Sequence, residues 1–295
     1  MARMPTIASR AEQLLGTAVV STTPVAGGDI CTATRLRLSD GRSALMKTRA
    51  RSPEDFFTVE AAGLKWLAEA GGVAIPDVLA AADDCLILAW IDPGRPSADA
   101  AERLGRQLAA THNAGSDSFG GPANGYIATA PLLNTPTESW PEFFLERRVL
   151  PYLKLARDRS NIATSDAEAI ETVAARIDEF AGPAEPPARL HGDLWSGNVV
   201  WSSEGLGWLV DPAAHGGHRE TDLAMLTLFG APHLTRLIDA YHEASPLADG
   251  WRERIPLHQL HPLLVHAVLF GGSYGARAGA AARSLLEHTA GSEPT

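Results

Sequence analysis

The residues with the clearest chemical potential lie between positions 190 and 211. The sequence runs Leu-His-Gly-Asp-Leu-Trp-Ser-Gly-Asn from residue 190 to 198, which places Asp193 five residues before Asn198. This H-x-D-x-x-x-x-N spacing is typical of the catalytic loop of phosphotransferases. Phosphoryl transfer requires a carboxylate beside the acceptor hydroxyl and a divalent cation between the phosphates and protein oxygens. Asp193 can accept the hydroxyl proton, and the amide oxygen of Asn198 can bind Mg²⁺.

A second carboxylate follows Asn198 at a spacing that can return it to the same site. Two short apolar runs, 199–201 and 206–210, flank a Ser-Ser-Glu-Gly turn and predict a β-hairpin. Asp211 follows 18 residues after Asp193, and its carboxylate is a hard oxygen ligand suited to Mg²⁺. Any one of these residues alone is explained as easily by a turn. Together they predict a kinase-like site in which Asn198 and Asp211 hold the metal.

The elements that would position this site begin with a small β-rich region. Strand-like runs separated by turn residues predict a five-stranded antiparallel sheet at 18–24, 32–38, 43–48, 75–79 and 85–91, with helices at 4–16 and 53–70. The first turn contains Gly27 and Gly28, whose backbone could approach phosphate oxygens closely. Gly-Gly turns also join many hairpins that bind no ligand, so this signal is weak by itself.

Lys47 lies on an apolar strand, at the end of the run Ala-Leu-Met-Lys. A lysine buried on a strand is costly unless an anion lies beside it. Kinases place such a lysine on the nucleotide phosphates and pair it with a helix glutamate. Glu60, 13 residues further on in the predicted helix, is the expected partner. The alternative is that Lys47 lies on an edge strand and that Glu60 is a solvated helix residue.

The chain is long enough for two lobes, since 295 residues exceed a single ordinary core. The Pro/Gly-rich segment at 92–96 is typical of a hinge. We therefore predict an α+β, two-lobed fold with a nucleotide-binding lobe at 1–91 and a mainly helical catalytic and substrate-binding lobe at 92–295. Leu88, Trp90 and Ile91 would contact adenine near the hinge. Helical periodicity predicts helices at 98–113, 140–155, 166–180, 233–244, 257–270 and 274–289.

Histidines and charged residues follow the second metal ligand directly. Two interpretations are open for residues 215–220: their side chains line the acceptor pocket, or the charged ones form internal ion pairs that brace the next helix. Asp222 is expected near the N-terminus of that helix, where the helix dipole favours an acid, and bracing is the prediction for it. For the substrate pocket we predict His215, His218, Arg219, Glu220 and, from the catalytic loop, Trp195.

Composition argues against some classes of function. The net charge is −10, whereas non-specific nucleic-acid binding depends on clustered Lys and Arg. The N-terminus lacks the apolar core of a signal peptide, and no run approaches the ~18 apolar residues of a membrane span. Cys31 and Cys85 make no disulfide framework, although Cys31 is a candidate reactive thiol. The expectation is a cytoplasmic monomer or weak dimer with no nucleic-acid or membrane partner.

The segment His191-Gly-Asp-Leu-Trp-Ser-Gly-Asn198 resembles the signature of the fructosamine kinases, also called ketosamine kinases. They belong to the aminoglycoside-phosphotransferase-like branch of the protein-kinase-like fold. The resemblance extends over nearly the whole chain and includes Asp-Pro-Ala at 211–213, Gly-His-Arg-Glu at 217–220 and Asp-Leu-Ala-Met at 222–225. The H-G-D…N…D residues alone would indicate only a small-molecule kinase, whereas the Trp-Ser pair and the two later runs are typical of this family.

The resemblance implies ATP- and Mg²⁺-dependent phosphorylation of a sugar hydroxyl on a ketosamine, either small or protein-bound. Phosphorylation at the 3-hydroxyl makes such an adduct unstable, so the amine is released. By position, Asp193 would be the base, Asn198 and Asp211 the metal ligands, and Lys47 with Glu60 the phosphate clamp.

Two alternatives stay open. The same fold could act on another acceptor, such as an aminoglycoside, choline or homoserine, or the chain could be a catalytically inactive nucleotide-binding module. The filled catalytic positions count against the second alternative. Where tyrosines often follow the D-P-A run in the family, this chain has His215 and Gly216, a difference that bears on sugar preference.

Overall fold

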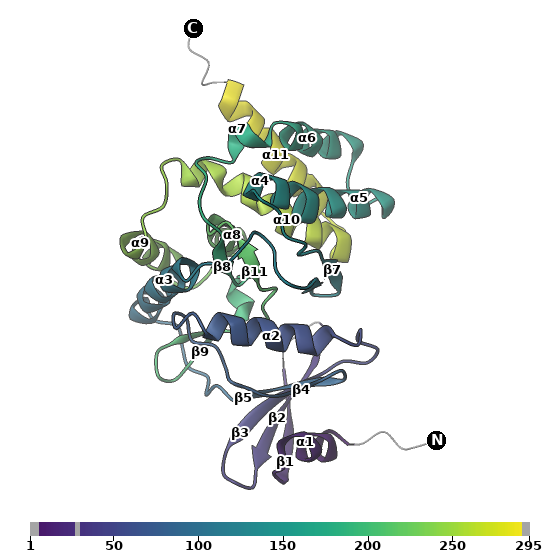
Figure 1. Cartoon of the computed structure of the whole chain (residues 1–295), viewed down its shortest axis with the longest axis vertical. Coiled ribbons are helices and arrows are strands. Elements are labelled where there is room, and N and C mark those ends of the chain that lie inside the picture. The colour runs from purple at the N-terminus through teal and green to yellow at the C-terminus, as the bar shows by residue number, and fades with distance from the viewer. Residues whose placement is uncertain (1–5, 27–29, 291–295) are drawn as a thin grey trace.

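The structure is a computed structural model that describes residues 6–26 and 30–290. It consists of a sheet lobe and a larger, mainly helical lobe (Figure 1), which confirms the predicted α+β, two-lobed architecture. The sheet lobe contains a five-stranded antiparallel sheet of order β1-β2-β3-β5-β4. Its strands are β1 (Val19–Val25), β2 (Thr32–Leu38), β3 (Ser43–Thr48), β4 (Val78–Ala82) and β5 (Cys85–Ala89).

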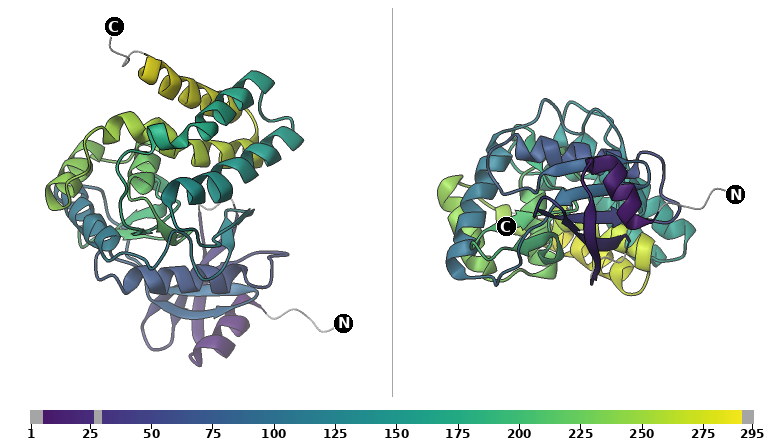
Figure 2. Two further views of the ribbon diagram at one scale, coloured as in Figure 1. Left: turned by 45° about the horizontal axis from the view of Figure 1, so that its top comes forward. Right: turned by 90° about the horizontal axis from the view of Figure 1, so that it is seen from below.

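Side chains along β3 alternate between the two faces of the sheet. Ala44 and Met46 are buried on the face covered by α1 (Ile7–Leu15). Successive side chains of a strand point to opposite faces, so Lys47 points toward α2 (Phe56–Ala68), which lies between the sheet and the helical lobe (Figures 1 and 2). Lys47 pairs with Leu86 of the neighbouring β5. The edge-strand alternative for Lys47 is therefore wrong.

The two helices of this lobe are shorter than predicted. α1 begins after Thr6, whose hydroxyl accepts a hydrogen bond from the amide of Ser9, and it ends at Gly16 in the left-handed region. Such ends satisfy backbone groups that the helix leaves unpaired. α2 buries Phe57, Leu64 and Leu67 against the sheet and the helical lobe.

The fourth strand does not lie where the sequence predicts it. Residues 75–79 are predicted, but β4 runs from Val78 to Ala82. Pro76 has no amide hydrogen to donate to a neighbouring strand, and pairing begins only after it. The strand then continues through three alanines, 80–82, which carry little strand propensity and were therefore missed.

The helical lobe combines long helices with short strand pairs. Its helices are α3 (Ala98–Asn113), α4 (Trp140–Phe143), α5 (Leu150–Asp158), α6 (Thr164–Ala175), α7 (Ile177–Phe180), α8 (Glu220–Phe229), α9 (Leu234–Ala244), α10 (Trp251–Phe270) and α11 (Tyr274–Ala290), with a π-helix at Phe144–Val149. Its strand pairs are β6 (Gly125–Ile127) with β7 (Ala130–Leu132), β8 (Ala188–Leu190) with β11 (His215–Gly217), and β9 (Val199–Trp201) with β10 (Gly207–Leu209).

The predicted helical regions are helical in the structure, but some of the predicted helices are interrupted. The predicted helix 140–155 is α4, the π-helix and α5 in succession, and the predicted helix 166–180 is α6 followed by α7. α10 begins at Trp251, six residues before its predicted start, and contains Pro256. A proline removes one helical hydrogen bond, and the buried side chains of Trp251 and Arg254 keep the preceding turn packed. The predicted hairpin after Asn198 is confirmed as β9–β10.

The connection between the lobes runs from the end of β5 at Ala89 to the start of α3 at Ala98. The predicted lobe boundary after residue 91 falls within this connection, and its position stays a prediction. Among residues 6–26 and 30–290, no helix combines the length and the apolar character that a bilayer crossing requires.

Candidate active site

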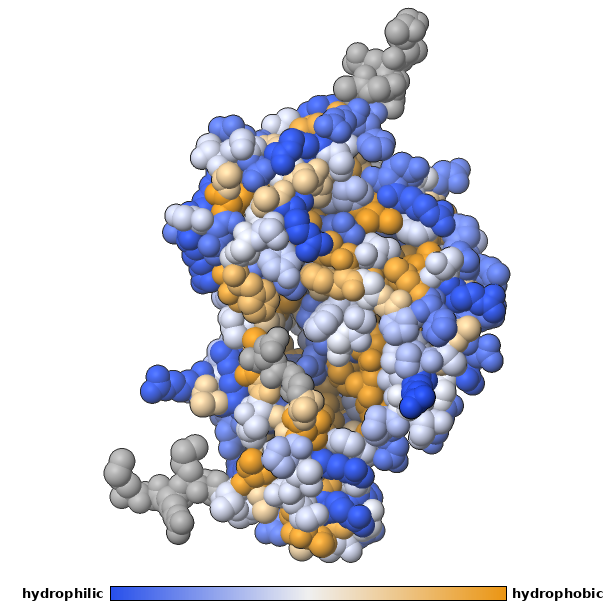
Figure 3. All heavy atoms as spheres, turned by 180° about the vertical axis from the view of Figure 1, so that it is seen from behind, coloured by the Kyte–Doolittle hydropathy of each residue, from blue (hydrophilic) through white to orange (hydrophobic). Residues whose placement is uncertain are grey.

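A cavity of about 1750 Å³ lies between the two lobes. Apolar residues gather along this hollow (Figure 3). Most of the residues predicted from the sequence line it together: Lys47, Glu60, Leu88, Trp90, Ile91, Asp193, Trp195, Asn198, Asp211 and His215. Gly27 and Gly28 fall outside the described residues.

The backbone of the catalytic loop is held by a side chain of α8 and lies close to the segment that follows Asp211. Asp222, on the first turn of α8, accepts hydrogen bonds from the amides of His191 (2.8 Å) and Gly192 (2.9 Å). Gly192 has φ +82°, and a Cβ there would lie 2.2 Å from the carbonyl oxygen of Ala213. Only glycine fits this conformation and this close approach. The geometry agrees with the bracing role predicted for Asp222.

Asp193 and Asn198 contact each other at one side of the cavity. Nδ2 of Asn198 donates to the backbone oxygen of Asp193 (2.8 Å) and to its Oδ2 (3.2 Å). These bonds leave Oδ1 of Asn198 as the oxygen that can bind a cation. Burial raises the pKa of Asp193 to about 7, the Asn198 hydrogen bond opposes that shift, and the charges of Asp211 and Asp222 add to it. A carboxylate with such a pKa is suited to accept a proton at neutral pH.

Lys47 joins the sheet lobe to the second carboxylate. Its Nζ lies 2.6 Å from Oε1 of Glu60 and 2.8 Å from Oδ1 of Asp211. Burial alone would lower the pKa of Lys47, but these two carboxylates raise it above its usual value. The side chain of Asp211 is 47% exposed, so its carboxylate is open to the cavity. Asp211 and Asn198 together offer the hard oxygen donors that Mg²⁺ prefers.

Another part of the cavity lining is aromatic. Trp195, predicted as a substrate residue, is 39% exposed and lies 6.2 Å, ring to ring, from Phe229. Phe229 contacts His266, which in turn contacts Phe270 and Tyr274. These four further residues line the cavity and were missed in the sequence. His266 and Phe270 are four positions apart on α10, the spacing of one helix face, which is a signal that could have found these two.

His215 lines the cavity as predicted, but as a fixed neutral ring. Its Nδ1 donates to the carbonyl oxygen of Ala213 at 2.8 Å. Burial and then the nearby charge of Arg148 lower the pKa of His215 to about 3. Cys31 also lines the cavity and is half-buried. Burial raises the pKa of its thiol, so the structure gives Cys31 no feature of an activated thiolate.

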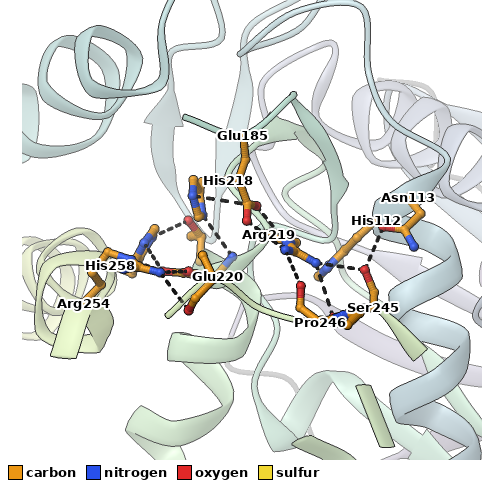
Figure 4. Close-up of polar contacts among 12 residues, drawn as sticks. His112, Asn113, Glu185, His218, Arg219, Glu220, Ser245, Pro246, Arg254 and His258 are labelled. Atoms are coloured by element: carbon orange, nitrogen blue, oxygen red, sulfur yellow. Dashed lines mark hydrogen bonds and ion pairs between the residues drawn. The ribbon is translucent and has the colours of Figure 1, made fainter. Parts of the chain in front are cut away.

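The remaining predicted pocket residues lie elsewhere. His218, Arg219 and Glu220 do not line the cavity; they form a largely buried polar network with Glu185, Arg254 and His258 (Figure 4). Nε and Nη2 of Arg219 contact the carboxylate of Glu185 at 2.7 and 2.8 Å. Arg254 holds Glu220 with two bonds of 2.9 and 2.6 Å. The structure therefore favours the internal ion-pair interpretation of this run and corrects its assignment to the acceptor pocket.

His218, Glu220 and His258 place one ligand-type atom each within 4.8 Å of one another, a spacing that resembles a metal site. Both oxygens of Glu220, however, already accept hydrogen bonds from Arg254. A cation here would lie beside a guanidinium that repels it. Burial would raise the pKa of Glu220, but His258 and Arg254 lower it to about 2. The three residues therefore form an ion-pair cluster rather than a metal centre.

We expect the protein to lose stability in mild acid. Burial lowers the pKa of His215 and His218 to about 3, and that of His261 well below its usual value. The unfolded chain takes up these protons below pH ~6.5, so stability falls as pH falls. The raised pKa of Asp193 opposes this and offsets part of it. The free energy of unfolding should drop by about 2 kcal/mol between pH 7.5 and 5.5.

Urea denaturation at the two pH values measures this difference. A His218→Gln variant should show a shallower dependence on pH, since it removes one of the three protons. A midpoint that does not change between pH 7.5 and 5.5 would contradict buried neutral histidines.

Comparison with known proteins agrees with this geometry. A family model for fructosamine kinase matches residues 3–288. A Thermus thermophilus protein named a probable ketoamine kinase is 37% identical over 251 residues, which cover 85% of this chain and 88% of the relative. The chloroplastic protein-ribulosamine 3-kinase of Arabidopsis thaliana is 32% identical over 257 residues, 85% of this chain and 78% of that protein.

Solved structures give the same result. A candidate fructosamine-3-kinase from Thermobifida fusca superposes with a TM-score of 0.92 and 46% identity, covering 96% of this chain and 99% of that one. The protein APH(2")-IIa, solved in complex with gentamicin, shares the fold alone, at 14% identity and a TM-score of 0.59. The chain therefore belongs to the fructosamine kinase family and is a phosphotransferase that acts on a hydroxyl group.

Proposed function

We propose that this protein transfers the γ-phosphoryl group of ATP to a sugar hydroxyl of a ketosamine, with Mg²⁺ as cofactor. The observation that carries the proposal is that Asp193, Asn198, Asp211 and Lys47 line one cavity together with a cluster of aromatic side chains. The first group provides what phosphoryl transfer needs, and the aromatic cluster provides a surface on which a sugar ring and its substituent can pack.

In this proposal Asp193 orients the acceptor hydroxyl and accepts its proton. The hydroxyl oxygen forms a bond to the γ-phosphorus while the bond to the β,γ-bridging oxygen breaks, which releases ADP. Lys47, held by Glu60, would contact the phosphates, and Leu88, Trp90 and Ile91 would surround adenine. Gly27 and Gly28 are proposed to cover the phosphates.

Asn198 and Asp211 would hold Mg²⁺, which neutralises the charge that develops on the phosphate oxygens. The donor set fits this ion: Oδ1 of Asn198 is not used by the bonds that Nδ2 makes, and the Asp211 carboxylate is half-exposed toward the cavity. In the present contact Lys47 neutralises Asp211. A phosphate group entering beside Lys47 would give that ammonium a second anionic partner, which frees Asp211 for the cation.

The charge of the cavity favours a ketosamine over an aminoglycoside. The described carboxylates that line it are Glu60, Asp117, Asp193 and Asp211, and three of these are used by the catalytic arrangement. Only Asp117 is then left to bind an acceptor amine, which suits one cationic amine rather than several. Phosphorylation of the sugar at its 3-hydroxyl would destabilise the adduct and free the amine, so the proposed role is deglycation.

The test is Mg-ATP turnover on fructosyl-lysine, ribulosyl-lysine and erythrulosyl-lysine, with kanamycin and choline as alternative acceptors. We expect ADP release with the ketosamines and none above background with kanamycin or choline. Omission of Mg²⁺ should abolish turnover. Turnover confined to kanamycin or choline would overturn the proposed substrate but not the catalytic residues.

A further inference from the structure

One continuous segment supplies many of the residues that line the cavity. This acceptor-side loop, residues 116–137, joins α3 to α4 and contains only the short hairpin β6–β7. Residues along its whole length line the cavity, among them Gly120, Ala123, Tyr126, Leu132 and Pro136. The position of this loop therefore contributes to the shape of the cavity.

The base of the loop is fixed within the helical lobe. Gly120 and Gly216 exchange backbone hydrogen bonds of 2.8 and 2.7 Å, which ties the loop to β11 and so to the segment beside the catalytic loop. Asn134 is buried and links three parts of the loop. Its backbone oxygen accepts a hydrogen bond from the Gly121 amide, and its backbone amide donates to Oδ1 of Asn124. Its side-chain Nδ2 donates to the carbonyl oxygen of Ala123.

A buried guanidinium supports this base from behind. Arg148, in the π-helix, donates to the Leu133 carbonyl oxygen at 2.5 Å and to Oδ1 of Asn134 at 2.6 Å. Arg148 is 2% exposed and pairs with no carboxylate in the described parts of the chain. Its hydrogen bonds to the loop are therefore the main compensation for its burial. The base of the loop is rigid for this reason.

The tip of the loop reaches the other lobe (Figure 1). The hydroxyl of Tyr126 donates to Oδ1 of Asp55 at 2.7 Å, and its ring lies 5.4 Å from that of Phe56. Gly125 lies so close to α2 that a Cβ there would be 3.2 Å from Cγ1 of Val59. The loop thus touches the first two turns of α2.

Asp55 departs from the usual behaviour of its position. It immediately precedes α2, where an aspartate normally accepts hydrogen bonds from the first amides of the helix. Its side chain makes no such cap and instead accepts the hydroxyl of Tyr126. The carboxylate that should stabilise its own helix is used to connect that helix to the acceptor-side loop.

The connected helix carries a residue of the phosphate clamp. Glu60 lies five residues after Asp55 and holds Lys47 at 2.6 Å, which itself contacts Asp211. A displacement of the first turns of α2 would move Glu60 with them, because a helix of this length moves as a unit. The loop therefore has a direct mechanical connection to the nucleotide side.

We propose that the Tyr126–Asp55 contact is an interlobe positioning contact through which the acceptor-side loop holds α2, and with it Glu60 and Lys47, in the geometry that binds nucleotide. An acceptor that packs against the loop would then tighten nucleotide binding, and nucleotide would tighten acceptor binding by the same factor. Both consequences for binding rest on the proposed function; the Tyr126–Asp55 contact itself does not.

The first experiment uses no acceptor. Tyr126→Phe removes only the hydroxyl and keeps the ring against Phe56. We expect it to weaken binding of the ATP analogue Mg-AMPPNP about fivefold, the lower end of typical coupling between sites, and to speed hydrogen exchange at residues 55–62. Asp55→Ala should have the same effect, and the double variant should be no worse than either single one, because both remove one contact.

Asp84→Ala is the matched control in the same lobe, since Asp84 pairs with Arg10 on the outer side of the sheet, away from the cavity. It should leave both readouts unchanged. Tyr126→Phe should also leave the melting temperature close to that of the wild type, which separates positioning from general destabilisation. Wild-type affinity and wild-type exchange in Tyr126→Phe would overturn the proposal.

The second experiment repeats the titration with saturating fructosyl-lysine. In the wild type we expect fructosyl-lysine to tighten Mg-AMPPNP binding, and in Tyr126→Phe we expect most of that increase to disappear. An increase that persists unchanged in the variant would overturn the coupling. Failure of fructosyl-lysine to bind the wild type would instead count against the proposed function, while the acceptor-free experiment still decides the positioning contact.

Discussion

Replacement of Asp193 by asparagine should lower kcat about 10³-fold, within the range that general bases contribute, and leave the affinity for Mg-ATP nearly unchanged. Asparagine keeps the size of the side chain and can still contact Asn198, but it cannot accept the hydroxyl proton. Because Asp193 contacts Asn198, whereas Lys47 contacts Glu60 and Asp211, the loss should fall on turnover rather than on nucleotide binding.

Steady-state kinetics with fructosyl-lysine and a calorimetric titration with Mg-AMPPNP measure the two quantities separately. Asp158→Asn is a suitable control, since Asp158 forms an exposed ion pair with Lys154 on α5. It should match the wild type in both assays. An Asp193→Asn enzyme that keeps more than a tenth of wild-type turnover would exclude Asp193 as the base.

The second large effect concerns stability. Glu220→Gln should reduce the free energy of unfolding by about 3 kcal/mol, because it leaves the guanidinium of Arg254 buried without its counter-ion. The side chains of Glu220 and Arg254 are only 2% and 9% exposed, so water cannot replace the lost charge. Activity per folded molecule should be retained at 25 °C, since neither residue lines the cavity.

The matched control is Glu171→Gln, which makes the same substitution in the pair with Arg157 on the surface of α6, where both side chains are more than 40% exposed. Exposed pairs of this kind contribute about 0–1 kcal/mol. Urea denaturation of the two variants gives the comparison. Equal stability losses in the two variants would contradict the buried ion pair. A loss of turnover in folded Glu220→Gln would indicate that Glu220 acts in the acceptor pocket.

The catalytic half of the site could be predicted because its geometry is local in sequence. The spacing from Asp193 to Asn198, and the hairpin that returns Asp211, are set by a loop and two short strands. Lys47 and Glu60 were also accessible, because a charged residue on an apolar strand requires a partner. In each case a pattern within a short stretch of sequence was enough to predict which side chains meet in the folded protein.

The acceptor half could not be predicted in the same way. His218, Arg219 and Glu220 look like pocket residues in the sequence, and only their partners Glu185 and Arg254, far away in the chain, show that they face inward. The ring residues of α10 and α11 that line the cavity were not among the residues predicted for the acceptor pocket. The continuous helix predicted over 140–155 was also wrong, because a π-helix at Phe144–Val149 separates α4 from α5.

Different segments of the chain supply the reacting groups and the acceptor-side loop of the cavity, and this separation affects how the substrate range of such enzymes can diversify. The reacting groups come from residues 47–60 and 193–211, whereas the acceptor-side loop is one uninterrupted piece of chain that begins and ends in the helical lobe. A single recombination event could therefore exchange that wall as one segment without changing the sequence of the groups that handle phosphate. Only replacement loops that retain a hydroxyl at position 126 would keep the connection to Asp55. A new substrate specificity and the affinity for nucleotide would then both depend on this one side chain.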